Sequence, residues 1–448
     1  MQELNFLPVL TCIIIFATVG ALIYFDFDLL QPSVTFFATM AMSLLLGMPN
    51  IERWNLYVGP DTSIIVICGM AAFLIGSVFF HDSFYKKHGI YEGNRIRKGI
   101  YEIPVSVIFI CTGIILILLY FSTKELYDLS VELGNRDGLL NMIKTLRYPL
   151  ERGEIEFSRW NGYRGYVTMA LASSFLYFFI YNFIVGASRK FKTWLLLCPV
   201  LAYIPFFILS TGRRSAVHFI ISGLVLGGIL YQQKYGISRH VQTKILKLVG
   251  MTGVFAVGLY FLMGFLTGKV RIGGRDPLTI ISHYGGLSVP ALEQYVSAVR
   301  AETQYYLQNT AMGIYGNLNT LGFDLEKGRG FLPFVSFTGT ESITTNVYTV
   351  FYRLLTDFSF PGLLVVMFIF GIYLTFTYEW LRCHDIPAGL TVYAYYGYIP
   401  FFLFIDDQFM GLFTTTTIYR CILITLFLHV IRKRYWRVSE SLTDMKNE

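Results

Sequence analysis

The chain has 448 residues, of which 54% are hydrophobic and only 15% charged, and its formal net charge is +7. Soluble proteins carry about 25% charged residues, so this composition excludes an ordinary soluble domain. Apolar runs of near-bilayer length recur along the whole sequence. We therefore predict an all-α, polytopic membrane protein that forms a single integral membrane domain over residues 1–448.

About eleven apolar runs are long enough to be membrane-spanning helices. The predicted spans are 4–25, 32–49, 62–80, 103–122, 165–186, 194–210, 215–232, 247–268, 359–381, 388–405 and 411–431. The first run lacks a basic leader and a small-residue cleavage site, so we expect a retained span rather than a signal peptide. The six cysteines include no Cys-x-x-Cys pair, which supports neither a disulfide framework nor a zinc site.

Lysines and arginines are concentrated in alternate connections between the predicted spans. These basic segments are 86–98, 189–192, 234–244 and 432–434. Short basic loops stay on the cytoplasmic side, so this pattern predicts a cytoplasmic carboxyl end and an outer amino end. The multi-pass protein would then present the connection 269–358 as its large extracytoplasmic loop.

Within the loop 269–358, the apolar residues Leu292, Tyr295, Val296 and Val299 follow helical spacing. Glycines recur on both sides of this stretch. A loop of this length in a compact protein is usually functional or disordered. We expect short amphipathic helices that lie on the membrane and are separated by glycine turns.

Five arginines lie at or near the outer ends of predicted spans, and two of them are adjacent in the turn 210–215. They are Arg213, Arg214, Arg271, Arg275 and Arg353. An arginine within the bilayer is costly unless it has an anionic partner. Guanidinium groups bind phosphate oxygens in bidentate fashion. We therefore expect these arginines to bind the phosphates of a lipid-linked substrate.

A polar stripe follows the loop: Asn346, Arg353 and Asp357 fall on one helical face together with two threonines. This stripe faces either a water-filled cavity, where Asn346 and Asp357 would bind sugar, or bulk water at the membrane surface. Arg420, near the middle of the last span, requires an acidic or phosphate partner, for which Asp357 and the Asp406–Asp407 pair are candidates.

Three residues on the predicted outer side are candidate general bases. His218 lies four residues after Arg214 on the same helix face, His283 lies in the long loop, and Asp407 lies in a turn between spans. For His218 the alternative is a hydrogen-bonded core histidine. No glycine-rich nucleotide loop or Walker motif is present, and Asp26-Phe-Asp28 lies in a loop on the predicted inner side, so we expect no cofactor, no metal and no nucleic-acid partner.

Four features resemble the bacterial oligosaccharide repeat-unit polymerases, the Wzy type of O-antigen and capsule pathways. They are the Thr-Gly-Arg-Arg-Ser turn, the large outer loop, the segment Thr345-Asn-Val-Tyr-Thr with Asp357-Phe-Ser-Phe-Pro-Gly, and the span pattern. The resemblance implies the membrane-embedded glycosyltransferase C-like fold shared with O-antigen ligases, and location in the bacterial cytoplasmic (inner) membrane. It also implies a metal-independent enzyme that transfers a growing glycan from undecaprenyl pyrophosphate onto a new lipid-linked repeat unit.

Under this hypothesis the partners are the undecaprenyl-pyrophosphate-linked oligosaccharide, membrane lipid and a chain-length regulator protein. Two alternatives share parts of the same pattern. An O-antigen ligase would use the same donor but deliver the glycan to lipid A core. A flippase or transporter of lipid-linked oligosaccharide would be expected to carry gates on both faces, often with internal repeats, which the sequence does not show.

Overall fold

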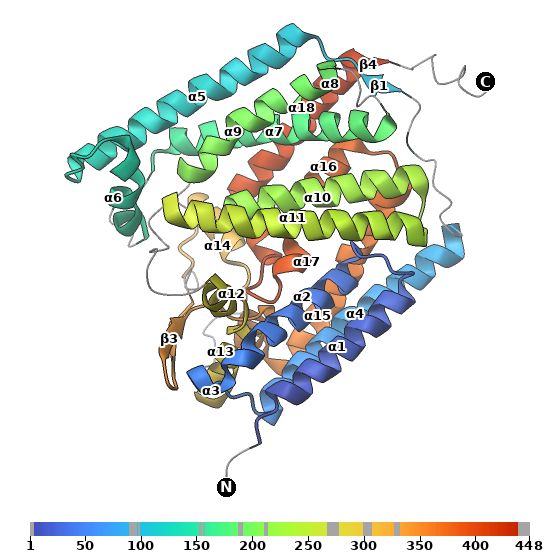
Figure 1. Cartoon of the computed structure of the whole chain (residues 1–448), viewed down its shortest axis with the longest axis vertical. Helices are drawn as coiled ribbons and strands as arrows, with labels where there is room; N and C mark the ends of the chain where they lie inside the picture. Colours follow the sequence, from blue (N-terminus) through green and yellow to red (C-terminus); the bar gives the residue numbers. More distant parts are fainter. Residues whose placement is uncertain are drawn as a thin grey trace. The chain divides into compact units, whose positions relative to one another are not determined.

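The computed structural model describes residues 4–88, 96, 99–151, 155, 157–186, 191–209, 214–266, 277–298, 307–326 and 332–437 (Figure 1). The regular elements of these residues are helices and two short two-stranded ribbons, joined by loops. Ten helical segments among them are long and apolar enough to cross a membrane. The prediction of an all-α, multi-pass membrane protein is confirmed at this level.

The region 388–405, predicted as one span, is divided into two helices. α16 (Pro387–Tyr396) and α17 (Ile399–Phe402) are separated at Gly397, and neither is long enough to span a bilayer. A Cβ at Gly397 would lie 2.9 Å from Val225 Cγ1, so the chain passes close to its neighbour at this break. The apolar composition of the run is the same on both sides, so it gave no sign of the interruption.

The chain divides into two compact units, and the single integral membrane domain over residues 1–448 stays a prediction. Unit 1 contains Met1–Tyr91, Gly274–Trp380 and Tyr398–Thr415, and unit 2 contains Glu92–Gly273, Leu381–Gly397 and Thr416–Glu448. Hydropathy identifies which segments can span a membrane, but it does not show which of them pack together. The division therefore had no signal in the apolar pattern.

The membrane helices of unit 1 come from both halves of the sequence. They are α1 (Leu7–Tyr24), α2 (Pro32–Gly47), α4 (Pro60–His88) and most of α15 (Val350–Cys383). α2 begins sharply because the Gln31 side chain accepts hydrogen bonds from the Ser33 and Val34 amides, and Pro32 needs no amide partner there. α4 and α15 approach closely, with Ser77 Oγ donating to the Gly371 carbonyl at 3.2 Å.

The long loop contributes the remaining elements of unit 1. These are α12 (Pro277–Gly285), α13 (Ser288–Ala298), α14 (Met312–Thr320), β2 (Val335–Thr338) and β3 (Ser342–Thr345). The short helices agree with the sequence prediction, and the antiparallel pairing of β2 with β3 is an addition to it.

This loop packs against the connection between α2 and α4, which contains η1 (Met48–Asn50) and α3 (Ile51–Trp54). Arg53 Nη1 donates to Thr279 Oγ1 at 2.9 Å, and the Gly59 amide donates to Glu293 Oε2 at 2.7 Å. Ser43 Oγ, near the end of α2, donates to the Gly285 carbonyl. Both connections therefore lie at the same end of unit 1, as the alternation of the predicted spans requires.

α15 is interrupted near its first third. Ser359 has φ 56° and ψ −176°, a conformation that is nearly restricted to glycine. The sequence predicted a break at Phe360-Pro361-Gly362, because a proline inside a helix removes a backbone hydrogen bond. The observed break lies one residue earlier and separates a short polar helical segment from the apolar span.

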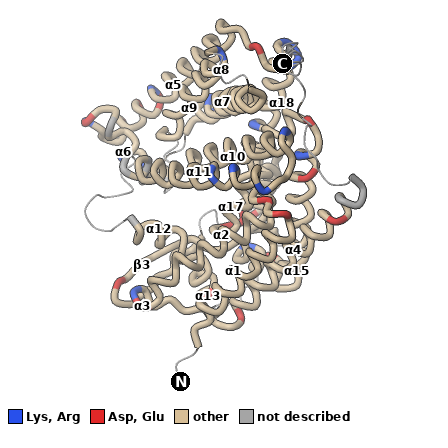
Figure 2. Tube along the Cα trace, turned by 45° about the vertical axis from the view of Figure 1, so that its right-hand side comes forward, with Lys and Arg blue, Asp and Glu red and all other residues tan. Residues whose placement is uncertain are grey.

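Unit 2 is assembled around the buried helix α7. Its elements are β1 (Ile100–Tyr101), α5 (Val105–Glu132), α6 (Leu139–Glu151), α7 (Arg159–Val185), α8 (Phe191–Leu195), α9 (Leu197–Leu209), α10 (Arg214–Tyr235), α11 (Arg239–Leu266), α16, α18 (Thr415–Tyr435) and β4 (Trp436–Arg437). Large apolar side chains of α11 such as Val254 and Phe255 are exposed, as expected of a lipid-facing helix. Few charged residues lie along the long helices (Figure 2).

Candidate functional site

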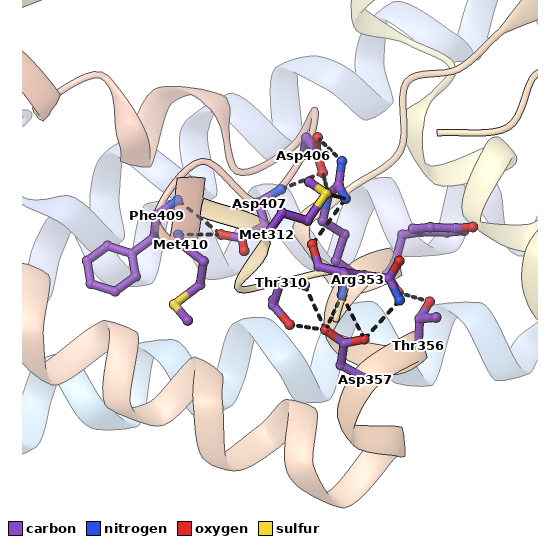
Figure 3. Close-up of polar contacts among 11 residues, drawn as sticks. Thr310, Met312, Arg353, Thr356, Asp357, Asp406, Asp407, Phe409 and Met410 are labelled. Atoms are coloured by element: carbon purple, nitrogen blue, oxygen red, sulfur yellow. Dashed lines mark hydrogen bonds and ion pairs between the residues drawn. The ribbon is translucent and has the colours of Figure 1, made fainter. Parts of the chain in front are cut away.

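The first two turns of α15 present a polar face inside unit 1 (Figure 3). Arg353, Thr356 and Asp357 are spaced three and four residues apart, so their side chains lie on the same side of the helix. Arg353 and Asp357 are each only 3% exposed. This is the stripe that the sequence predicted, and it is covered by protein rather than by bulk water.

Arg353 is held by the carboxylate of Asp406. Its Nε donates to Asp406 Oδ1 at 2.8 Å and its Nη2 donates to Asp406 Oδ2 at 3.2 Å. Nη1 also donates to the Asn309 carbonyl at 3.2 Å. This bidentate geometry is the strongest form of the pair, and it neutralises a charge that would otherwise be costly to bury.

Asp357 binds the turn that precedes α14. Its carboxylate accepts hydrogen bonds from the Asn309 amide and Nδ2 at 3.0 and 2.9 Å, and from the Thr310 amide at 2.7 Å. The Thr310 hydroxyl donates to the same carboxylate. Asp357 therefore fixes a loop that also supplies a carbonyl to Arg353. Asn346, the other residue expected to bind sugar, is half-buried just before α15.

Asp407 is a buried carboxyl group with one unused oxygen. Its amide donates to Asp406 Oδ1 at 2.8 Å, and its Oδ1 accepts from the Phe409 and Met410 amides at 3.0 and 3.2 Å. Oδ2 is buried and has no hydrogen-bond partner among the residues that the structure describes. The backbone thus fixes the carboxyl orientation and leaves the second oxygen buried without a hydrogen bond from the described residues.

The environment of Asp407 raises its pKa from 3.8 to about 7. Burial is the largest cause, and the neighbouring Asp406 carboxylate adds to it. The amides of Met410 and Phe409 and the guanidinium of Arg353 act in the opposite direction. A carboxyl group with a pKa near neutrality is suited to accept and return a proton at physiological pH.

Three tyrosines form an aromatic group beside this cluster. The ring centroids of Tyr295 and Tyr352 are 4.5 Å apart, and those of Tyr348 and Tyr352 are 4.4 Å apart. Thr356 Oγ1 donates to Tyr295 Oη at 3.1 Å, which joins the aromatic group to the polar face. The sequence signal was only the high tyrosine content, which does not say which tyrosines meet.

The two candidate histidines lie in different units. His283, on α12 of unit 1, has its Nε2 2.8 Å from the Thr344 carbonyl and therefore donates to β3. His218 lies on α10 of unit 2, four residues after Arg214, as predicted. Arg214 is exposed at the first residue of α10. Arg213, Arg271 and Arg275 lie outside the described residues.

Arg420 has a different partner from the acidic ones that were predicted. Its Nη1 donates to Tyr395 Oη at 2.8 Å, and its guanidinium lies 5.1 Å from the ring centroid of Tyr166. Asp406 and Asp357, two of the predicted partners, are occupied by Arg353 and by the Asn309–Thr310 turn. The prediction was wrong for Asp406 because Arg353 binds this carboxylate instead.

No protein-family model, curated protein or solved structure matches this chain. Within the described ranges, no three histidine, cysteine, aspartate or glutamate side chains are grouped so that they could hold a metal ion. The Arg353–Asp406–Asp407 cluster and its neighbours form the candidate functional site.

The sequence identified Arg353, Asp357 and Asp407 as candidate residues, but it did not predict how they are connected. Asn309, Thr310 and Asp406 provide the contacts that join them, and these residues are far from Arg353 in the chain. An unpaired aspartate in a loop is usually a solvated residue, so only the fold distinguishes Asp407 from such a residue.

Proposed function

We propose that this protein is a membrane glycosyltransferase that polymerises undecaprenyl-pyrophosphate-linked oligosaccharide repeat units at the outer face of a bacterial cytoplasmic membrane. The observation that carries the proposal is Asp407, a buried carboxyl group with a pKa near 7, a fixed orientation and an unused oxygen. Two half-buried tyrosines of the same polar region, Tyr295 and Tyr352, have flat apolar faces of the kind against which sugar rings pack.

In the proposed reaction, a hydroxyl oxygen of the acceptor repeat unit attacks the anomeric carbon of the donor glycan. The bond between that carbon and the pyrophosphate oxygen breaks, and undecaprenyl pyrophosphate leaves with the electron pair. The hydroxyl proton passes to Asp407 Oδ2. General-base assistance of this kind contributes roughly 10²–10⁴-fold to the rate.

Arg353 has a positioning role in this proposal rather than the pyrophosphate role expected from the sequence. Its guanidinium is engaged by Asp406 and by the Asn309 carbonyl, and Asp406 in turn binds the Asp407 amide. That Arg214, Arg213, Arg271 and Arg275 bind the leaving pyrophosphate stays a prediction from the sequence.

Asp407 is preferred as the base over the two histidines. His283 already donates its Nε2 proton to the Thr344 carbonyl. His218 lies on the apolar helix α10, where a core histidine is the simpler explanation. Asp407 is also linked to the start of α15, because its amide donates to Asp406 and Asp406 is paired with Arg353.

The test is reconstitution of the purified full-length protein with lipid-linked repeat units. The proposal predicts a ladder of products that differ by one repeat, formed without added metal or nucleotide. In the absence of a chain-length regulator protein we expect a broad ladder. Transfer of a single glycan to lipid A core would instead identify a ligase, and movement of the substrate across the bilayer without a new glycosidic bond would identify a transporter.

A further inference from the structure

A cavity of about 300 Å³ lies at the carboxyl end of α18 in unit 2. It is lined by His429, Arg432, Lys433 and Trp436. Arg432 and Lys433 follow His429 by three and four residues, so these three side chains lie on one face of the last helical turns. The proposed glycosyltransferase reaction uses none of these residues.

The fourth lining residue, Trp436, belongs to an aromatic cluster. β4 pairs with β1, which sets Trp436 opposite Tyr101, and the two ring centroids are 4.9 Å apart. Asn182 fixes β1, because its side chain accepts from the Tyr101 amide and donates to the Tyr101 carbonyl, both at 2.9 Å. Tyr181 adds a second ring contact to Trp436 at 5.8 Å. Trp436 thus packs against two rings, Tyr101 and Tyr181, and Asn182 holds the first of them in place.

Arg432 has a distant carboxylate partner among the described residues. Asp385 Oδ2 is 4.0 Å from Arg432 Nη2, which is too long for a hydrogen bond. Asp385 therefore attracts the guanidinium without engaging its fork of donors. Lys433 is exposed beside it.

A solvated basic helix end would not need such a cavity. Positive residues commonly follow a span and interact favourably with the carboxyl end of a helix. Arg434 fits that description, because it is exposed and lies over the Tyr435 ring at 5.8 Å. Arg432 differs because it lines the cavity together with Trp436. The two neighbouring arginines therefore provide a matched comparison.

We propose that this cavity binds the phosphate group of an anionic phospholipid. The arginine fork matches phosphate oxygens, the lysine adds a point charge, and a tryptophan at a span end has an apolar face for the glycerol region. A lipid headgroup is favoured over free phosphate because the cavity lies at the end of a predicted span, at headgroup depth, on the face predicted to be cytoplasmic.

The test measures the melting temperature of the full-length protein in detergent while phosphatidylglycerol, phosphatidylcholine or inorganic phosphate is added. We expect phosphatidylglycerol alone to stabilise the protein. Arg432→Gln should weaken the apparent affinity for phosphatidylglycerol about tenfold. Arg434→Gln removes the same charge two residues later in the chain, outside the residues that line the cavity, and should leave the affinity unchanged. Lys433→Gln provides a second cavity variant in case Arg432→Gln does not fold.

Three results would overturn the proposal. Equal losses in Arg432→Gln and Arg434→Gln would mean that net charge, not the cavity, attracts the lipid. A response to inorganic phosphate as large as that to phosphatidylglycerol would assign the cavity to a free phosphate species. A melting temperature that does not change when phosphatidylglycerol is added would show that the protein has no such site.

Discussion

At the scale of single residues, Arg353 and Asp407 are linked through Asp406 but differ in what their surroundings provide. Asp406 offers both oxygens to the guanidinium and one of them also to the Asp407 amide. Asp407 receives two backbone donors on one oxygen and none on the other among the described residues. The helical spacing of the sequence predicted the Arg353–Asp357 face, whereas these through-space contacts depend on loops that no local pattern specifies.

The raised pKa of Asp407 makes the stability of the protein depend on pH. The folded state holds this proton up to a pH of about 7, whereas the unfolded chain releases it near 3.8. The contribution is therefore fully present below the unfolded pKa and is lost as the pH rises through 7. We expect Asp407→Asn to gain stability relative to the wild type as the pH rises from about 4 to about 7, and to keep that advantage at higher pH.

Melting temperatures of the two proteins across this pH range measure the effect. Asp61→Asn removes an exposed carboxylate in the first turn of α4 and serves as the control. Parallel curves for the wild type and Asp407→Asn would contradict a raised pKa at this site.

Replacing Arg353 should be costly, because it leaves Asp406 beside Asp407 without its cation. Loss of one member of a buried ion pair costs about 3–5 kcal/mol. The ion pair between Arg53 and Glu341 has a similar nitrogen–oxygen distance, 2.9 Å, but its side chains are 34% and 47% exposed. Exposed pairs are worth at most about 1 kcal/mol. Denaturation midpoints of Arg353→Gln and Arg53→Gln should therefore differ clearly, and equal losses would place Arg353 in solvent.

At the scale of elements, α4 and α15 contact each other through their backbones. A Cβ at Gly76 would lie 2.2 Å from the Phe368 carbonyl oxygen, and one at Gly371 would lie 2.1 Å from the Phe73 carbonyl oxygen. Small residues allow membrane helices to approach in this way, since lipid supplies no hydrophobic drive between them. The contact holds the apolar part of α15 against α4, and the polar start of α15 precedes it.

Gly371→Ala should destabilise unit 1, because the added methyl group meets backbone that cannot rotate away. Overpacking of this kind costs about 1–3 kcal/mol. Gly20→Ala on α1 is the matched control, since a Cβ there has no atom within 4 Å. Alanine is favoured over glycine inside a helix by up to about 1 kcal/mol. Melting temperatures that fall for both variants, or for neither, would contradict the close approach.

The elements that the sequence predicted best are those with a continuous apolar period. The interruption of α15 was predicted from Pro361, and it occurs at Ser359, whose φ of 56° the sequence does not specify. The division of 388–405 was missed because Gly397 lies in a run that is apolar throughout. The β2–β3 hairpin was missed because its strands have only four residues each.

At the scale of the whole molecule, composition and run length were sufficient for the multi-pass, all-α class. They were not sufficient for the two compact units, whose segments alternate along the chain. The arginines expected to meet at one membrane depth are divided between Arg353 in unit 1, Arg214 in unit 2 and three residues outside the described ranges. The candidate site is consequently built on the polar start of α15 and the Asp406–Asp407 turn.

The most direct test of the account is the product ladder formed by Asp407→Asn in the reconstituted reaction. This variant keeps the size of the side chain and its Oδ1 acceptor but removes the base. We predict that the ladder is lost, with a rate at least about 10²-fold lower, while Asp61→Asn forms the wild-type ladder and both proteins melt as folded species. An undiminished ladder from Asp407→Asn would contradict the central claim.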